Sequence, residues 1–259
     1  ILMKNSKINI GQYTEFTEVV DIKRLNFIAD IIQTYCQPGA KVLDIGCGNG
    51  NIARGIGSLG YHVTGIDFSE NAVRYAKSKN TLPNVDFKVC SAEQVTDGDQ
   101  FDAVICSEVL EHLHNPDGLM NTIAKILRPG AILIATVPNG VGPRELLVTR
   151  PVQKMSKSWM GGLINQSKKM LGYSNSTVQS QSEDLTHVQF FTKHAITSLI
   201  QKHGFDLLQF GHSNFVEKVF PYSMLTRRVK ALSKLDNSVI DYLPSVMASG
   251  FNTAWRRTW

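Results

Sequence analysis

Three glycines at alternate positions form the clearest chemical feature of this 259-residue chain. Gly46, Gly48 and Gly50 follow an apolar run within the stretch VLDIGCGNG. Glycine lets the backbone turn tightly there and lets a ligand approach the main chain. A helix that begins after the loop would offer free N–H groups to a nucleotide. The spacing is GxGxG, with Asn51 where a dinucleotide-binding loop would have its third glycine.

An aspartate ends the second apolar run, in the stretch GIDFS. At this place in a doubly wound sheet, the Asp67 carboxylate can accept hydrogen bonds from both hydroxyls of a ribose. Phe68 beside it offers an apolar face to a base. A helix N-terminal role for Asp67 is the alternative, but Ser69 serves as an N-cap better.

Two later strand ends carry polar residues that would complete a cleft. The stretch CSAEQV places Ala92 and Glu93 after the third apolar run, where they could contact an adenine edge. The stretch CSEVLEHL places Ser107 and Glu108 after the fourth run. Open α/β sheets bind ligands beyond the carboxyl ends of their strands, so we expect these residues to share one site.

Carboxylates and imidazoles gather in the stretch SEVLEHLHNP. If this segment is a helical turn, Glu108, Glu111 and His112 share one face. They could then bind a divalent cation such as Mg²⁺ or Mn²⁺, which would lower the pKa of an acceptor hydroxyl. In the alternative interpretation the glutamates cap and pair locally, and His112 is a base or merely lines the cleft.

Apolar runs and helical patterns alternate through the first half of the chain, which predicts a parallel sheet covered on both faces. We expect strands at 41–45, 61–67, 85–90, 101–107 and 131–137, and helices near 21–36, 52–59, 69–78 and 116–127. The segment LRPG at 127–130 is predicted to be a helix end and a turn. A helix at 190–205 capped by Thr192, a strand at 205–210 and a final strand in ASGFNTAWRR are expected later.

Composition favours one globular domain over residues 1–259, because 42% of the residues are apolar and 19% are charged. We divide it into a cofactor-binding core at 20–139, a lid or substrate insertion at 140–186, and a C-terminal part of the sheet with a basic tail at 187–259. No apolar run approaches a membrane span, and no signal peptide is expected at the start. Four cysteines without a CxxC pair favour reduced thiols in the cytoplasm.

The ordered motifs VLDIGCGNG, GIDFS, SAE, FDAVICSEVLEHL and LRPGAILIATVPN resemble those of class I S-adenosylmethionine-dependent methyltransferases, over about 20–140 and again at 187–215. The resemblance implies a Rossmann-like, mostly parallel seven-stranded sheet with an antiparallel last strand. It also implies S-adenosylmethionine as cofactor and S-adenosylhomocysteine as product. The implied contacts are Asp44 and the loop of Gly46, Cys47, Gly48 and Gly50 for the methionine moiety, Asp67 for the ribose, Phe68, Ala92 and Glu93 for the adenine, and Ser107 for the amino-acid end.

The ExxEH run also resembles the metal sites of ubiquinone-biosynthesis O-methyltransferases and of small-RNA 2′-O-methyltransferases. The latter add a distant histidine before an aromatic-x-Thr stretch, and HVQFFT places His187 in that role. The resemblance implies His112 and His187 as catalytic residues, and a Mg²⁺ or Mn²⁺ site made of Glu108, Glu111, His112 and His187. Similar relatives also carry LEHL without using a metal, so both interpretations stay open.

Methyl transfer requires an acceptor placed in line with the methyl group and, for a hydroxyl, a group that takes its proton. We expect a small-molecule hydroxyl acceptor, because SEVLEH replaces the Asn/Asp-Pro-Pro-Tyr-like run of many nitrogen methyltransferases. The GxGxG spacing disfavours an NAD-dependent oxidoreductase. A cofactor-binding scaffold without turnover is a further alternative. Nucleic acid is not expected as a partner, because the basic residues concentrate in one insertion.

The insertion is basic and amphipathic. From Gly140 to Ser182, six basic residues stand against one acid, and Met155, Trp159, Leu163 and Met170 recur at near-helical spacing. One interpretation is a lid helix packed on the cleft. The other is peripheral contact with anionic membrane lipid or an amphiphilic substrate, such as a lipid-linked, quinone-like or glycosylated acceptor. The basic tail, with Arg227 and Arg228, would extend this surface, and the oligomeric state is not predicted.

Overall fold

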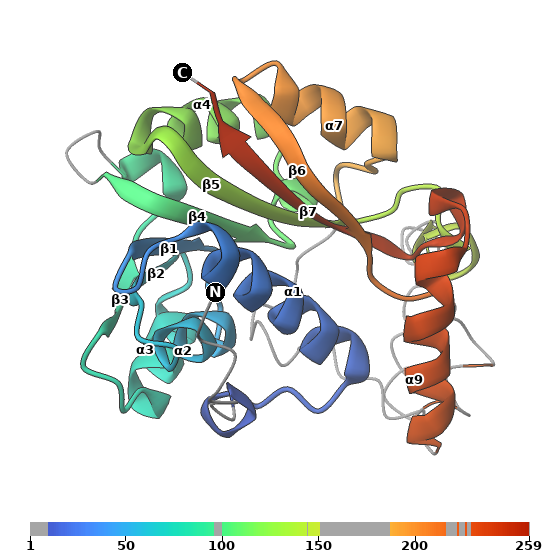
Figure 1. Cartoon of the computed structure of the whole chain (residues 1–259), viewed down its shortest axis with the longest axis horizontal. Helices are drawn as coiled ribbons and strands as arrows, with labels where there is room; N and C mark the ends of the chain where they lie inside the picture. Colours follow the sequence, from blue (N-terminus) through green and yellow to red (C-terminus); the bar gives the residue numbers. More distant parts are fainter. Residues whose placement is uncertain are drawn as a thin grey trace, which may run out of the picture.

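Strands that are apolar on both faces form the centre of the fold, as β1 (Lys41–Ile45) illustrates with four consecutive buried residues. The computed structural model describes residues 10–95, 100–143, 145–150, 187–215, 222, 226 and 229–258. Within them, seven strands form one sheet in the order β3-β2-β1-β4-β5-β7-β6 (Figure 1). The other strands are β2 (His62–Asp67), β3 (Val85–Val89), β4 (Phe101–Ser107), β5 (Leu127–Pro138), β6 (Phe205–His212) and β7 (Gly250–Arg257).

The first five strands run parallel, as the alternation of strands and helices predicts. Val42 of β1 pairs with Val63 of β2 on one side and Ala103 of β4 on the other. β5 pairs with β4 in the same direction. The carboxyl ends of these strands therefore meet at one edge of the sheet, which is where ligands bind open α/β sheets.

β7 runs against both of its neighbours, because it pairs antiparallel with β5 and with β6. The expected antiparallel last strand in ASGFNTAWRR is confirmed, and it lies inside the sheet rather than at its edge. Trp255 of β7 is fully buried, and its indole N–H donates to Thr253 Oγ1 at 2.8 Å. The last strand in the chain thus ties the C-terminal segment into the core.

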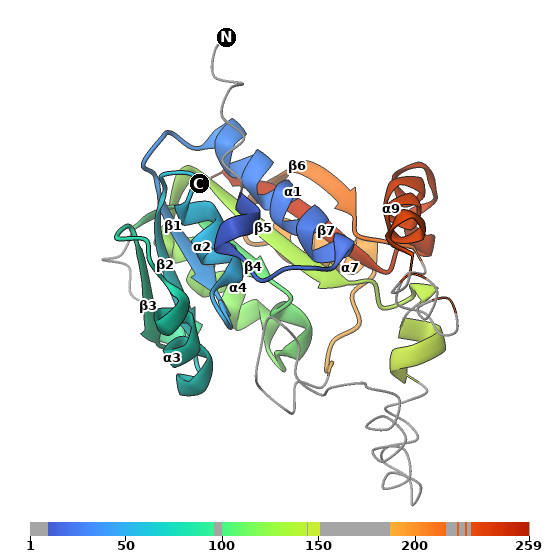
Figure 2. The same ribbon diagram turned by 90° about the horizontal axis from the view of Figure 1, so that it is seen from below.

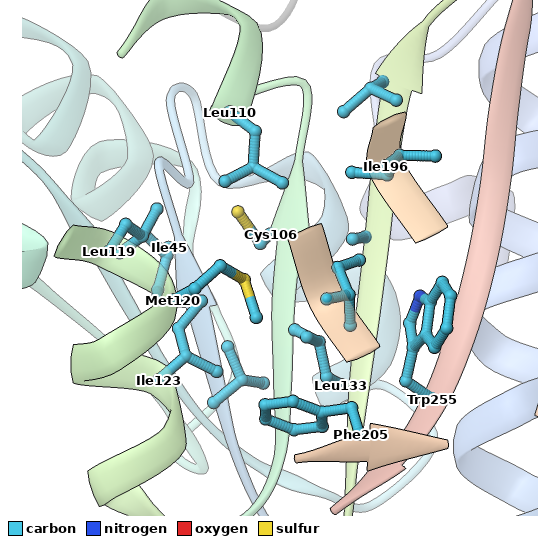
Figure 3. Close-up of a cluster of buried hydrophobic side chains, with 14 of the residues drawn as sticks. Ile45, Cys106, Leu110, Leu119, Met120, Ile123, Leu133, Ile196, Phe205 and Trp255 are labelled. Atoms are coloured by element: carbon cyan, nitrogen blue, oxygen red, sulfur yellow. The ribbon is translucent and has the colours of Figure 1, made fainter. Parts of the chain in front are cut away.

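Helices cover both faces of the sheet (Figures 1 and 2). α4 (Pro116–Ile126) and α7 (Lys193–Gln201) pack on one face, where their apolar side chains join one buried cluster. Met120 and Ile123 of α4 point toward Cys106 and Leu133 of the sheet in Figure 3. The other face carries the second cluster, to which three helices contribute: α1 (Val19–Tyr35), α2 (Asn51–Gly57) and α3 (Glu70–Lys79).

Short elements and one outlying helix complete the chain. They are η1 (Ile10–Tyr13), η2 (Ala92–Gln94), η3 (Leu110–His112), the π-helical η4 (Glu145–Thr149), α9 (Lys230–Val239), η5 (Ile240–Tyr242) and η6 (Ser245–Met247). No helix among the described residues is long and apolar enough to cross a membrane.

Two predicted N-caps are confirmed, and one predicted turn is wrong. Ser69 Oγ accepts the Ala72 N–H at 3.3 Å, and Thr192 Oγ1 accepts the Ala195 N–H at 3.1 Å. The segment 127–130 belongs to the start of β5 instead of forming a turn. Leu127 pairs with Phe101, and the register with β4 then shifts, so this strand begins earlier than its apolar run suggests.

Candidate cofactor and acceptor site

The glycine loop after β1 has the left-handed backbone that its sequence predicts. The φ angles are +67° at Gly46, +52° at Gly48 and +74° at Gly50. A Cβ at Gly46 would lie 2.5 Å from Val109 Cγ2, and one at Gly50 would lie 2.5 Å from Phe87 Cζ. Glycine is therefore required for packing as well as for conformation. Cys47 between them is buried, and burial raises the pKa of its thiol well above the ordinary value, so it stays neutral.

Asp67 at the end of β2 holds this loop directly. Its Oδ2 accepts the Gly48 N–H at 2.9 Å, and its Oδ1 accepts the Ser69 N–H at 2.8 Å. Each carboxylate oxygen can accept a further hydrogen bond, so two hydroxyls of a ribose could still be bound. Phe68 is 67% exposed, which leaves an aromatic face open beside the carboxylate.

Asp44 of β1 lies fully buried beneath the loop. The Ala53 backbone N–H donates to its carboxyl group, whereas Oδ2 has no hydrogen-bond partner among the described residues. Burial, followed by the charge of Asp67, raises the pKa of Asp44 to about 8. A buried carboxyl oxygen without a partner is costly, and a bound ammonium group would satisfy it. This oxygen and the glycine cradle fit the methionine end of S-adenosylmethionine.

The remaining predicted cofactor residues lie at the ends of β3 and β4. Ala92 begins η2, which Gln94 closes by accepting the Ser91 N–H at 3.0 Å. The side chain of Glu93 lies outside the described residues. Ser107 is buried, and its hydroxyl is 2.9 Å from Thr136 Oγ1 of β5. Thr136 lies within the stretch LRPGAILIATVPN, but the sequence gives it no role, because its contact with Ser107 depends on the pairing of β5 with β4.

Glu108 is turned away from the residues that follow it. It is the one non-glycine residue with positive φ in the described part of the chain, at +57°. Its Oε1 accepts the Thr136 hydroxyl at 3.1 Å and lies 3.5 Å from Nη1 of Arg24 in α1. The expectation that it shares a helical face with Glu111 and His112 is wrong, because only residues 110–112 form the turn.

Glu111, His112 and His187 come together at the end of η3. Their potential ligand atoms all lie within 4.8 Å of one another, and Glu108 is not in the group. The Glu111 carbonyl accepts the N–H groups of Val188 and Gln189 at 2.8 and 2.9 Å, which fixes the His187 segment against η3. The rings of His112 and His187 are 5.2 Å apart, nearly edge to face. Two histidines far apart in the sequence thus meet, and His112 follows three residues after Val109, which contacts Gly46 of the glycine loop.

The family model of a methyltransferase domain matches residues 20–210. The chain belongs to the methyltransferase-domain family. This match and the sheet topology confirm the resemblance to class I S-adenosylmethionine-dependent methyltransferases.

Curated relatives of this methyltransferase carry the name ubiquinone biosynthesis O-methyltransferase. The relative from Dechloromonas aromatica is 36% identical over 130 residues, which cover 49% of this chain and 56% of that protein. The relative from an Azoarcus species is 37% identical over 130 residues, covering 48% and 55%. The chain spans about half the length of the curated relatives it matches.

Solved methyltransferases share the fold at low sequence identity. The magnesium protoporphyrin IX methyltransferase of Synechocystis, with bound S-adenosylhomocysteine, has a TM-score of 0.56 and 16% identity, covering 93% of this chain and 84% of that one. An S-adenosylmethionine-dependent methyltransferase from Mesorhizobium loti has a TM-score of 0.56 and 16% identity, covering 90% and 100%.

The histidine cluster of this methyltransferase has a donor set that fits a divalent ion. Donor atoms around one ion at about 2.1 Å lie up to roughly 4.2 Å apart, close to the spacing seen here. Two imidazole nitrogens suit transition ions such as Mn²⁺ better than Mg²⁺, which prefers oxygen. The ligand roles of Glu111, His112 and His187, and of Glu108 outside the cluster, stay predictions.

A buried carboxylate that the sequence analysis missed lies behind His187. Glu145 of η4 is fully buried, and its Oε1 is 3.4 Å from His187 Nδ1. No local motif marks Glu145, because it lies inside the predicted insertion and meets His187 only through the fold. Most of the predicted lid, residues 151–186, and most of the basic tail around Arg227 lie outside the described residues, so the lid and the membrane contact stay predictions.

Proposed function

We propose that this methyltransferase transfers a methyl group from S-adenosylmethionine to a hydroxyl group of a small-molecule acceptor. The observation that carries the proposal is the contact between the two halves of the site. Val109 packs on Gly46 of the cofactor loop, and three residues later His112 stands beside His187. A donor bound in the loop would therefore lie next to two imidazoles.

Bound S-adenosylmethionine supplies an electrophilic methyl group on a sulfonium sulfur. The glycine loop and Asp67 hold the donor at the strand ends. His112 or His187 would accept the proton of the acceptor hydroxyl as the new carbon–oxygen bond forms and the methyl–sulfur bond breaks, which leaves S-adenosylhomocysteine as the neutral thioether product. No covalent protein nucleophile is required. A metal ion held by Glu111, His112 and His187 would instead lower the pKa of that hydroxyl.

We propose a quinone-like or otherwise lipid-linked acceptor. The names of the curated relatives support a ubiquinone-type hydroxyl compound, and the basic insertion supports an amphiphilic substrate near an anionic membrane. We therefore place the protein in the cytoplasm, with peripheral membrane contact.

Labelled methyl transfer tests the proposal. The protein is incubated with methyl-labelled S-adenosylmethionine and either a lipid extract, total RNA or a protein extract from cells. We expect label in an organic-soluble small molecule, and a large loss of label when His112 is replaced by alanine. Label confined to RNA or protein would overturn the acceptor class. Cofactor binding without any transfer would identify a non-catalytic scaffold.

Binding of S-adenosylhomocysteine is expected to release a proton from Asp44. The pKa of Asp44 is raised to about 8, so the carboxyl is mostly neutral at pH 7. Because the pKa is raised from 3.8 in the ordinary carboxyl to about 8, the free energy of unfolding of the unliganded protein falls progressively as pH rises from 3.8 to about 8 and is level above that. An ammonium beside the carboxyl lowers this pKa, so binding at pH 7 releases up to one proton.

Calorimetry at pH 7 in buffers of different ionisation enthalpy measures that release. The release should decrease as pH rises above 8, and Asp44→Asn should abolish this contribution. Equal proton release by Asp44→Asn and the unaltered protein would show that the ammonium does not meet Asp44.

If the histidine cluster holds a catalytic metal, EDTA is expected to abolish labelled methyl transfer and Mn²⁺ to restore it. Glu111→Gln should weaken binding of Mn²⁺ because it removes the charged ligand of the cluster. Asp117→Asn, at an exposed carboxylate that also contacts a histidine, is the matched control. Full transfer activity in EDTA would eliminate the metal and leave the histidines as bases.

A further inference from the structure

We propose that Glu145 is a positioning residue, which holds His187 with its proton on Nδ1 and so leaves the Nε2 lone pair free to accept a proton or bind a metal. This inference rests on the proposed function of the His112 and His187 pair. A neutral imidazole carries one N–H, and the hydrogen bond made by one ring nitrogen decides which nitrogen keeps it. The residue that faces Nδ1 therefore decides whether Nε2 is basic.

Glu145 is the carboxylate that faces Nδ1. The distance from Oε1 to His187 Nδ1 is 3.4 Å, and the side chains of Glu145 and His187 are 1% and 15% exposed. At this distance the pair does not meet hydrogen-bond geometry, and Nδ1 has no hydrogen-bond partner among the described residues. Catalytic contacts often tighten only when substrate is bound, and Glu145 Oε1 is the carboxylate oxygen placed to accept the Nδ1–H. In so buried an environment a carboxylate oxygen attracts the Nδ1–H more strongly than it would in water.

The chain places Glu145 there through a rigid segment. Asn139 is fully buried, and its side-chain amide donates to the Ala248 carbonyl at 2.8 Å. Gly142 approaches the same carbonyl so closely that a Cβ would lie 2.4 Å from the oxygen. The Leu146 N–H donates to the Gly142 carbonyl at 3.1 Å, at the start of the π-helix. Hydrogen bonds thus hold the backbone before Glu145, at Asn139, and after it, at Leu146.

The backbone that follows His187 is also held by hydrogen bonds and by a cation–π contact. The Gly140 N–H donates to the Phe191 carbonyl at 2.7 Å. Arg150 donates to the Gly140 carbonyl at 2.8 Å and stacks its guanidinium over the Phe190 ring at 4.7 Å. The Val188 and Gln189 N–H groups bind the Glu111 carbonyl, so the backbone that carries His187 is held next to η3.

The decisive experiment reads the tautomer of His187 directly. The protein is labelled with ¹⁵N-histidine, and long-range ¹H–¹⁵N correlation spectra are recorded at pH 8, where an ordinary imidazole is neutral. The His187 signals are assigned by their loss in His187→Gln. Glu145→Leu removes the acceptor, and Glu145→Gln, which keeps the size and polarity of the side chain, serves if the leucine variant does not fold.

The matched control is Asp117→Asn. Asp117, in the first turn of α4, is 2.9 Å from His203 Nε2 in a second carboxylate–histidine pair, and its side chain is 45% exposed. Removing this carboxylate should leave the His187 signals unchanged. Binding of S-adenosylhomocysteine is measured for every variant, because it tests the cofactor site separately from His187.

We expect the Nδ1–H pattern for His187 in the unaltered protein and in Asp117→Asn, and a switch toward the Nε2–H pattern in Glu145→Leu. Glu145→Gln should show a smaller shift in the same direction, because its amide oxygen can still accept the Nδ1–H but has lost the charge. Mn²⁺, used as a probe, should bind those variants roughly 10–100-fold more weakly if the cluster accepts it. An Nε2–H pattern in the unaltered protein, or an unchanged pattern without Glu145, would overturn the inference. Failure to bind S-adenosylhomocysteine would overturn the proposed function, while the tautomer would still decide the role of Glu145.

Discussion

Replacing Asp67 with alanine is expected to weaken binding of S-adenosylhomocysteine by roughly 100-fold or more. A hydrogen bond to a charged group contributes about 1.5–3 kcal/mol, and the change leaves two ribose hydroxyls without that acceptor. It also frees the Gly48 N–H, which Asp67 Oδ2 binds at 2.9 Å, so the loop itself loses a constraint. Isothermal calorimetry at constant pH measures the loss.

Two control variants separate these effects. Asp67→Asn keeps one carbonyl oxygen for Gly48 but has lost the charge, so its affinity should lie between those of the alanine variant and the unaltered protein. Asp86→Ala removes an exposed carboxylate on the neighbouring strand β3 and should leave the affinity unchanged. An Asp67→Ala variant that stays folded and binds with unchanged affinity would contradict the assignment of the ribose site.

Replacing Gly50 with alanine is expected to lower the free energy of unfolding by about 2–5 kcal/mol. The left-handed backbone costs roughly 1–2 kcal/mol for any residue with a Cβ, and overpacking adds about 1–3 kcal/mol. The new Cβ would lie 2.5 Å from Phe87 Cζ and 2.9 Å from the Ala76 Cβ, inside a packed core. Urea unfolding measures the difference.

Gly60→Ala isolates the conformational part of this loss. Gly60 also has a positive φ, +92°, but a Cβ there meets nothing within 4 Å. We expect this variant to lose only about 1–2 kcal/mol. Equal losses for the two variants would show that the contact with Phe87 contributes nothing to the requirement for glycine.

The centre of the sheet could be predicted from the sequence because β1 and β4 are buried on both faces and lie between turn and cap signals. The predicted bounds of β1 and β4 match the structure, and the caps Ser69 and Thr192 begin α3 and α7 as expected. The place of β7 inside the sheet follows from pairing with two strands distant in sequence, which no local pattern encodes.

The cofactor loop was predictable for a similar reason, since glycines at left-handed positions are visible as letters in the sequence. The surroundings of Glu108 and His187 were less predictable from the sequence. The left-handed backbone of Glu108 and its ion pair with Arg24 depend on a helix 84 residues earlier, and Glu145 meets His187 only in the folded chain. Helical spacing therefore placed Glu108 on the wrong side and gave no signal for Glu145.

The two flanks of the insertion are bonded to each other, from Gly140 to Phe191 and from Arg150 to Phe190. A segment that leaves and rejoins the fold at such a closed base can change in length or composition at little cost, because loop closure depends only weakly on length. The seven-stranded sheet would not need to change with it. Relatives of this fold could therefore differ in sequence and length between these two flanks while they keep the same sheet and glycine loop.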